Sequence, residues 1–277
     1  MPFRAYVSLL ITAVWVSCLA LPVWGDVTMN GGRLLQFEGP CPVPAHPSAK
    51  VQSDFDLAKE HFWLYVPKSY DGTKPYGLIV YVSPGSTQLG LPAGWGPVLD
   101  ADKLIFISPQ NVGNDQPRPR REGLCVVAEM EMAKKYAIDP NRVYASGFSK
   151  GGATASDVAF HHSDLFRATI QCCGTDFYKP LPFVERVPAD FVQHPEPYGA
   201  IACTPEQVAA AKKSVKFEIT TGTNDFRLHF VDDIFKGGFQ PEGFYAKLWF
   251  VPGTTHQPCR PETLRAVLAD IEGAKGR

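Results

Sequence analysis

Continuous apolar runs recur along the chain, separated by polar stretches that contain glycine and proline. The run at 77–82 is rich in β-branched residues, and such runs are typical of strands buried on both faces of a mainly parallel sheet. Several further runs have a similar length and end at proline, glycine or polar residues. We therefore expect strands at 61–66, 77–82, 104–108, 143–145, 166–172, 215–221 and 245–251.

Helical spacing appears between these runs. Leu124, Val127, Ala128 and Met132 recur at intervals close to the helical period, which predicts a helix from about 122 to 136. Strands that alternate with helices indicate an α/β architecture around a parallel sheet. Further helices are expected from about 150 to 161, from 226 to 235 and from 261 to 269.

Two stretches lack a regular pattern. Residues 26–55 are polar and proline-rich, and we expect an N-terminal arm there with an early edge strand. Residues 176–205 are also proline-rich and irregular. Irregular insertions of this length in a compact domain are usually functional or disordered, so we interpret this one as a lid or cap. The remainder fits a single domain over residues 26–277.

The N-terminus has the composition of a targeting segment. Arg4 is the only charged side chain before Asp26, and an apolar run follows it. Small residues near Gly25 favour cleavage there, so residues 1–25 are interpreted as a signal peptide. The prediction is a secreted or periplasmic protein with no stable membrane insertion after cleavage. Six cysteines remain in the mature chain, an even number that indicates disulfides without fixing their pairing: Cys41, Cys125, Cys172, Cys173, Cys203 and Cys259.

Charge excludes some classes of partner. The 277 residues carry a net charge of −1, and 45% of them are hydrophobic. That balance gives no sign of nucleic-acid binding. The one basic cluster is Arg118, Arg120 and Arg121, which we interpret as a solvated loop, with contact to an acidic substrate as the less favoured alternative. No Cys-x-x-Cys pair is present, and we expect neither a metal nor an organic cofactor.

The most informative motif is Gly147-Phe148-Ser149-Lys150-Gly151. It satisfies Gly-x-Ser-x-Gly between a predicted strand and a run of small residues that predicts a helix. Glycines at both ends permit a tight turn that lifts the serine hydroxyl above the sheet edge. The helix N-terminus then points its unpaired N–H groups to the place where an oxyanion would form. A chance match is the alternative, but the strand and helix on either side favour a nucleophilic serine.

A nucleophilic serine needs a base and an acid that orients the base. Where the serine lies in a Gly-x-Ser-x-Gly turn between a strand and a helix, the chain order is serine, acid, histidine. His256 follows the last predicted strand, so it is the preferred base. Asp225 follows the strand before it and is the preferred acid, although an aspartate there could simply cap a helix. Asp176 is the main rival for the acid. The remaining histidines are interpreted as helix-end, loop or helix residues: His161, His162, His194 and His229.

An oxyanion hole requires two N–H donors. Lys150, the residue after the serine, should supply one, and the loop after the 77–82 strand should supply the other. Pro84 has no N–H, so Gly85, Ser86 or Thr87 must donate, and Ser86 is preferred. Trp95 lies in the same glycine-rich loop region. It is predicted to stack on a sugar or phenolic ring of the substrate, with a hydrophobic lid residue as the equal alternative.

The segment from Ile138 to Gly152 resembles the extracellular polyhydroxybutyrate-depolymerase and feruloyl-esterase-like branch of the α/β-hydrolases. Asp164-Leu165-Phe166, Gly222-Thr223-Asn224-Asp225 and His256-Gln257-Pro258 fit the same pattern in order, over about residues 60–265. The resemblance implies an α/β-hydrolase fold, a mainly parallel central sheet flanked by helices with an irregular cap insertion. It also implies a triad of Ser149, Asp225 and His256 that hydrolyses carboxylic esters.

Two departures from that family concern the site. The family usually has His-Gly at the oxyanion loop, where this chain has Ser83-Pro84-Gly85. It also often has glycine before the catalytic histidine, where this chain has Thr255.

Together, the motif, its candidate partners and the resemblance predict an exported serine esterase that acts on feruloylated or acetylated polysaccharide or on short polyester. A serine peptidase on the same fold and a non-catalytic binding protein on a hydrolase scaffold are the alternatives.

Overall fold

The computed structural model describes residues 28–29, 31–37, 56–181 and 201–273. The predicted signal peptide and Cys41 lie outside the described residues. So does most of the predicted cap insertion, because residues 182–200 are not described.

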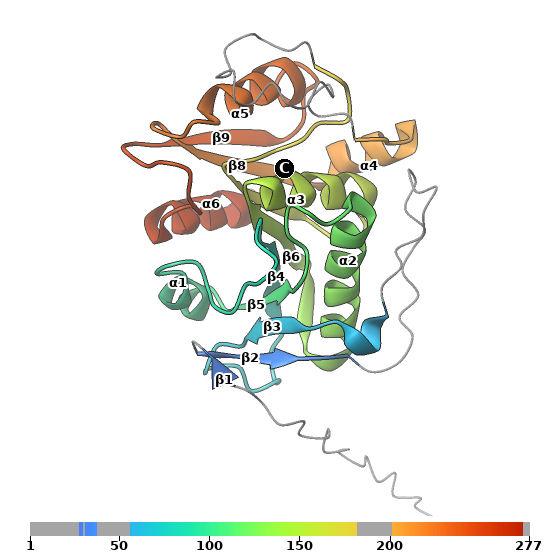
Figure 1. The fold of residues 1–277 in the computed structure, drawn as a ribbon, viewed down its shortest axis with the longest axis vertical. Coiled ribbons are helices and arrows are strands. Elements are labelled where there is room, and N and C mark those ends of the chain that lie inside the picture. Colours follow the sequence, from blue (N-terminus) through green and yellow to red (C-terminus); the bar gives the residue numbers. More distant parts are fainter. Residues whose placement is uncertain (1–27, 30, 38–55, 182–200, 274–277) are drawn as a thin grey trace, which may run out of the picture.

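A single twisted sheet runs through the centre of the molecule (Figure 1). In the described part of the chain it has nine strands in the order β1-β2-β3-β5-β4-β6-β7-β8-β9. From β5 to β9 all neighbours are parallel, whereas β1, β2 and β3 form an antiparallel extension beside β5. The strands are β1 (Thr28–Met29), β2 (Gly32–Leu35), β3 (Phe62–Tyr65), β4 (Tyr76–Val82), β5 (Leu104–Pro109), β6 (Ile138–Phe148), β7 (Ala168–Cys172), β8 (Lys216–Gly222) and β9 (Ala246–Val251).

Helices cover both faces of the sheet. α2 and α3 lie on one side, and α1 and α6 lie on the other (Figure 1). None of the helices within the described ranges has the length and apolar character that a membrane crossing requires. The α-helices are α1 (Gly96–Ala101), α2 (Arg118–Lys135), α3 (Lys150–His161), α4 (Pro205–Ser214), α5 (Leu228–Ile234) and α6 (Pro261–Gly273), with a short 3₁₀ helix η1 (Leu57–Lys59) and a π-helical turn η3 (Phe235–Phe239).

Strand β4 shows why the predicted strands are apolar throughout. Every one of its side chains is buried. Leu78 and Val80 join the core beneath α2 and α3, while Ile79 and Tyr81 join the core beneath α1 and α6. Because successive side chains point to opposite faces, a strand covered on both sides needs apolar residues at both. The predicted mainly parallel sheet, flanked by helices, is thus confirmed.

Some predicted boundaries were wrong. α2 begins at Arg118, so the supposed solvated basic loop is the first turn of a helix, and Arg120 and Arg121 are buried. The arginine-rich turn resembles a solvated loop in the sequence because its acidic partners are distant in the chain. Arg120, for example, forms a bidentate ion pair with Glu60. The strand predicted at 143–145 is shorter than β6, because the first residues of β6 have the composition of a turn. Helices α1 and α4 were not predicted.

The described cysteines are all free thiols, so the predicted disulfides are not confirmed. Cys125 lies in the core between α2 and the sheet, and that core cluster contains no other cysteine among the described residues. Cys172 and Cys259 are neighbours, because the Cys259 backbone N–H donates to the Cys172 sulfur at 3.4 Å.

A buried glutamate on β8 should make the fold less stable at alkaline pH. Burial raises the pKa of Glu218 to about 8, although the indole N–H of Trp249 donates to its carboxylate at 2.5 Å and opposes that rise. The folded state therefore holds a proton that the unfolded chain loses near pH 4.5. Stability should fall as pH rises from about 5 to 8, by several kcal/mol, since each pKa unit is worth about 1.4 kcal/mol.

Replacing this glutamate by its neutral isostere tests that expectation. Glu218→Gln should raise the midpoint of thermal unfolding at pH 9 and leave it almost unchanged at pH 5. Glu262→Gln, which alters an exposed residue at the start of α6, is the matched control. Equal effects of Glu218→Gln at both pH values would contradict the assignment.

Candidate functional site

The candidate site lies where the parallel strands end. Parallel strands bring their carboxyl ends to one edge of the sheet, and ligands of open α/β sheets bind outside that edge. Ser149 directly follows β6, Cys173 directly follows β7, and Asp225 and His256 lie in the loops after β8 and β9. The loop after β4 begins at Ser83 on the same edge. Residues that follow the ends of five different strands thus lie at one edge of the sheet, although these residues are far apart in the sequence.

Ser149 occupies the strained turn that the motif predicts. Its φ of 56° and ψ of −122° place it in a region that non-glycine residues rarely adopt. The two flanking glycines are required by contact. A Cβ on Gly147 would lie 2.3 Å from the Gly151 carbonyl oxygen, and one on Gly151 would lie 2.0 Å from the Val82 carbonyl oxygen. The Ser149 N–H donates to the Cys172 carbonyl at 2.7 Å, which anchors the turn to β7.

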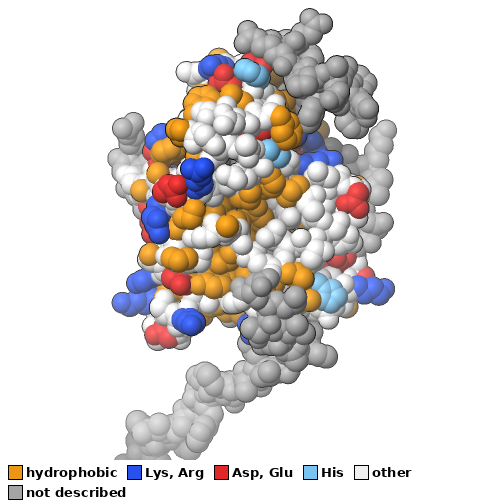
Figure 2. Space-filling view, turned by 60° about the vertical axis from the view of Figure 1, so that its left-hand side comes forward, with side chains coloured by type: hydrophobic (Ala, Val, Ile, Leu, Met, Phe, Trp, Pro, Cys, Tyr) orange, Lys and Arg blue, Asp and Glu red, His pale blue; other side chains and the backbone are white. Residues whose placement is uncertain are grey.

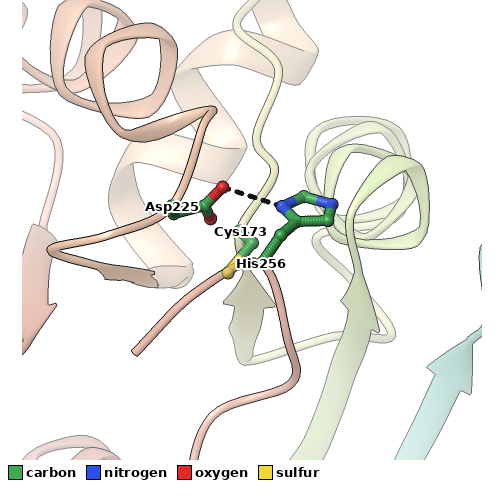
Figure 3. A group of neighbouring side chains, drawn as sticks. All are labelled: Cys173, Asp225 and His256. Carbon is green, nitrogen blue, oxygen red and sulfur yellow. Dashed lines mark hydrogen bonds and ion pairs between the residues drawn. The ribbon is translucent and has the colours of Figure 1, made fainter. Parts of the chain in front are cut away.

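A chain of hydrogen bonds joins the three predicted catalytic side chains. His256 Nε2 lies 2.9 Å from Ser149 Oγ, and His256 Nδ1 lies 2.9 Å from Asp225 Oδ1. Figure 3 shows the Asp225 carboxylate pointing to the near side of the imidazole. An ionised carboxylate accepts a hydrogen bond from Nδ1–H, which keeps the imidazole proton on Nδ1 and leaves the Nε2 lone pair as an acceptor for the serine hydroxyl. This is the geometry of a nucleophile, a base and an orienting acid.

Asp225 is held in its ionised form by several donors. Burial alone would raise the pKa of Asp225, but hydrogen bonds from His256, Cys173 and the Arg227 backbone outweigh it and lower that pKa. The Arg227 N–H donates to Oδ1 at 2.8 Å, and the Thr221 hydroxyl donates to Oδ2 at 3.2 Å. The alternative role of helix cap is not borne out, because the N-cap residue of α5 is Arg227 and no side chain caps that helix; the Asp225 carboxylate instead accepts the Arg227 N–H before the helix begins.

Two aromatic rings enclose the imidazole. The ring of Phe148, the residue before the nucleophile, lies 4.7 Å from that of His256, and the ring of Phe226 lies 4.3 Å from it. Phe226 is nevertheless 50% exposed, so it presents an apolar wall to solvent beside the base. Hydrophobic side chains also gather over the middle of the face in Figure 2. An ester with an apolar or aromatic group could pack on such a wall.

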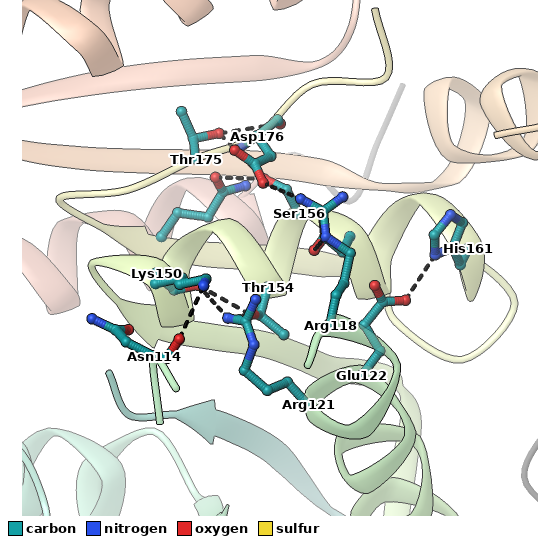
Figure 4. Close-up of polar contacts among 12 residues, drawn as sticks. Asn114, Arg118, Arg121, Glu122, Lys150, Thr154, Ser156, His161, Thr175 and Asp176 are labelled. Atoms are coloured by element: carbon teal, nitrogen blue, oxygen red, sulfur yellow. Dashed lines mark hydrogen bonds and ion pairs between the residues drawn. The ribbon is translucent and has the colours of Figure 1, made fainter. Parts of the chain in front are cut away.

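A network of charged side chains fixes the start of α3 against α2 (Figure 4). Arg118 lies 3.2 Å from Asp157 and 3.0 Å from Asp176. Arg121 donates to the Lys150 carbonyl at 3.2 Å and also to the Thr154 hydroxyl. These bonds hold the first turn of the helix that follows the serine. Asp176, the rival acid, is engaged with Arg118 rather than with His256.

The other histidines are placed away from the triad. His161 is the last residue of α3, and its Nδ1 lies 2.8 Å from Glu122 Oε2 (Figure 4). His162 follows it, and His229 lies within α5, as predicted for helix-end and helix residues. His194 lies outside the described residues. In the described chain, His256 is thus the histidine that meets the serine.

The two predicted oxyanion donors lie on the expected elements. Lys150 opens α3, and Ser86 lies in the loop after β4. The Gly85 N–H donates to the Ser83 hydroxyl at 3.2 Å, so Gly85 is already engaged. Asn111 and Asn114 donate to the Ser86 and Pro84 carbonyls at 2.7 and 2.8 Å and hold this loop in place. The donor roles of Lys150 and Ser86 remain predictions.

Trp95 is a core residue, whereas the sequence prediction placed it against the substrate or in a lid. Its side chain is completely buried in the core between α1, α6 and the sheet. Its indole N–H donates to the Cys259 carbonyl at 2.9 Å. A buried tryptophan needs a partner for that N–H, and here the partner lies three residues after His256. The residue supports the histidine loop from below.

Sequence reasoning missed two residues beside the triad. Cys173 has a φ of 57° and donates to the Gln257 carbonyl at 3.2 Å, next to Asp225. Phe226 covers one face of His256. Both directly follow a feature that the sequence did identify, a predicted strand and the candidate acid. Reading the residues after every predicted parallel strand as one group would have found Cys173.

Comparison with known proteins agrees with this architecture. The esterase Est22 superposes with a TM-score of 0.56 at 17% identity, covering 82% of this chain and 79% of that one. A mutant feruloyl esterase module from Clostridium thermocellum, complexed with sinapinate, gives a TM-score of 0.54 at 14% identity and 87% coverage of both chains. This chain has the α/β-hydrolase fold. At these identities the likeness establishes the fold alone.

The sequence comparisons add a narrower finding. The profile of the prolyl oligopeptidase family matches residues 124–234, which is less than half of the chain. A putative dipeptidyl aminopeptidase IV from Bacteroides ovatus has a TM-score of 0.54 at 16% identity; the match covers 77% of this chain but 33% of that one. No curated protein sequence matches. The α/β-hydrolase similarity thus extends to esterases and peptidases, and the polyhydroxybutyrate-depolymerase branch is not confirmed.

Proposed function

We propose that this chain is an exported serine esterase that hydrolyses carboxylic esters through an acyl-enzyme. The observation that carries the proposal is the continuous hydrogen-bond chain from Asp225 through His256 to a strained serine at a helix N-terminus. A serine hydroxyl stays protonated near neutral pH, so it needs a base within hydrogen-bond reach to become a nucleophile. His256 Nε2 meets that requirement at 2.9 Å.

The steps follow from these contacts. His256 takes the Ser149 proton as Oγ attacks the ester carbonyl, and Asp225 stabilises the imidazolium that forms. The Lys150 backbone N–H, with the Ser86 N–H as its proposed partner, stabilises the tetrahedral oxyanion. His256 then protonates the leaving alcohol, and a water activated by the same base releases the acid and restores Ser149. The residues require no metal or cofactor for this sequence.

The substrates best suited to the proposal are feruloylated or acetylated polysaccharides and short polyesters. Esterases among the similar structures support this choice, and the exposed ring of Phe226 beside the base supports a substrate with an apolar or aromatic part. A peptidase is the second candidate, because the prolyl oligopeptidase profile matches residues 124–234, which contain the elbow. A binding protein that kept the scaffold is the third.

A substrate panel separates these candidates. We would measure hydrolysis of p-nitrophenyl acetate, butyrate and octanoate, of methyl ferulate, and of proline-containing p-nitroanilides, with the wild type and Ser149→Ala. Ester turnover that is lost in the variant, with inert anilides, is the expected result. Turnover of anilides in preference to esters would support the peptidase, and equal inertness of both proteins on every substrate would support the binding protein.

The wall beside the base gives a sharper prediction on specificity. Phe226→Ala should raise KM for methyl ferulate about five- to tenfold and change KM for p-nitrophenyl acetate less than twofold, because an aromatic contact is worth about 1 kcal/mol beyond its area. Tyr245→Ala is the matched control. It removes another exposed aromatic ring, which precedes β9 at the opposite edge of the sheet. Equal KM changes for both esters would contradict the role of Phe226.

A further inference from the structure

A thiol lies beside the two residues that orient the candidate nucleophile. One ligand atom each from Cys173, Asp225 and His256 lie within 4.8 Å of one another. The residues come from three different strand ends, after β7, β8 and β9. Figure 3 shows the Cys173 side chain on the same side of the site as the Asp225 carboxylate. Acyl transfer by the triad does not require a thiol at this position.

The three donors form a set that suits zinc. Zn²⁺ binds thiolate sulfur at about 2.3 Å, imidazole nitrogen at about 2.0 Å and carboxylate oxygen at about 2.1 Å, in tetrahedral geometry. Those lengths place tetrahedral ligand atoms roughly 3.3 to 3.6 Å apart. His256 Nδ1 and Asp225 Oδ1, now 2.9 Å apart, would have to separate slightly, and the sulfur would have to approach. The sulfur lies within 4.8 Å of the other two ligand atoms, so its approach would be about 1.3 Å at most.

Burial adds to the case. Cys173 is a buried residue, and the Asp225 side chain is 0% exposed, whereas the His256 side chain is 18% exposed. The two inner donors are fixed by the fold: Cys173 by its left-handed backbone after β7, and Asp225 by the Thr221 and Arg227 donors. The imidazole is the most exposed member of the group.

We propose that Cys173, Asp225 and His256 bind a thiophilic divalent cation, Zn²⁺ above all, and that this binding switches off the triad. The metal would replace the Nδ1 proton of His256, which moves to Nε2, and the thiol proton would leave to solvent. An imidazole with its proton on Nε2 has no lone pair there for the Ser149 hydroxyl. The inhibition rests on the proposed esterase function, whereas the metal binding does not.

Spectroscopy tests the binding without any substrate. Titration of the wild type with CoCl₂ should produce a thiolate-to-cobalt charge-transfer band, and ZnCl₂ should abolish it by displacement. Cys173→Ala should lack the band. Cys203→Ala, which removes a half-buried thiol that precedes α4, should retain it and is the matched control. A band of wild-type intensity in Cys173→Ala, or no band in the wild type, would overturn the proposal.

Inhibition tests the consequence. Each protein is compared with its own metal-free rate on p-nitrophenyl butyrate, which removes any effect of the variant on that rate. ZnCl₂ should inhibit the wild type and Cys203→Ala at a concentration at least tenfold lower than Cys173→Ala, and EDTA should reverse the inhibition. Cys173→Ser, which keeps the side-chain volume, should follow Cys173→Ala. Inhibition of equal strength in all four proteins would contradict the switch even if the cobalt band is present.

Discussion

Ser149→Ala should reduce ester hydrolysis by a factor of about 10⁴ or more, without unfolding the protein. The variant keeps the turn and the N–H donors but lacks the atom that forms the acyl-enzyme, and only the residual acceleration from binding and from the oxyanion donors remains. Steady-state hydrolysis of p-nitrophenyl butyrate measures the loss, and circular dichroism checks the fold.

A serine on the strand that precedes the candidate nucleophile provides the control. Ser146 is fully buried in β6, and its hydroxyl donates to the Ile170 carbonyl at 2.9 Å. Ser146→Ala should cost about 1 kcal/mol of stability and leave kcat within about twofold of the wild type. Retention of more than a tenth of the activity by Ser149→Ala would show that another group performs the reaction.

Asp225→Asn should lower kcat by roughly 10³- to 10⁴-fold while leaving the fold intact. The neutral amide preserves the shape of the carboxylate, but it favours the imidazole tautomer with a proton on Nε2, which cannot accept the proton of Ser149. The loss of the negative charge also removes stabilisation from the imidazolium. Single-turnover kinetics of acyl-enzyme formation would locate the defect at the first chemical step.

The rival acid is the natural comparison. Asp176→Asn alters a carboxylate that pairs with Arg118 at 3.0 Å and has no contact with His256 within the described structure. It should change stability more than kcat, because it weakens the network that holds α2 against α3 (Figure 4). If Asp176→Asn caused the larger loss of kcat, the assignment of the acid would be wrong.

Much of the fold could be predicted because apolar runs report strands that are covered on both faces. Such runs identified β3, β4, β5, β7, β8 and β9 to within a few residues. The beginning of β6 could not be predicted, because Asp139-Pro140-Asn141 has the composition of a turn and joins the strand only in the tertiary context. The helical start at Arg118 was hidden for the same reason, since its partners Asp157 and Asp176 are distant in sequence.

The candidate site was more accessible to sequence reasoning than its surroundings. The elbow motif and chain order led to Ser149, Asp225 and His256, and the structure brings the three together. Trp95 was misjudged because a tryptophan in a glycine-rich loop looks exposed, and nothing local shows that α6 covers it. Cys173 and Phe226 are recognised as site residues only by their proximity to His256, which cannot be inferred from the sequence.

The most direct test of the account is covalent labelling of the folded protein with a fluorophosphonate, followed by mass spectrometry of its peptides. An assembled triad predicts one adduct on Ser149, no adduct in Ser149→Ala, and labelling at least 100-fold slower in Asp225→Asn than in Asp176→Asn. An unlabelled Ser149 in the folded wild type, or an adduct that forms equally fast without Asp225, would contradict an assembled nucleophile, base and acid at this sheet edge.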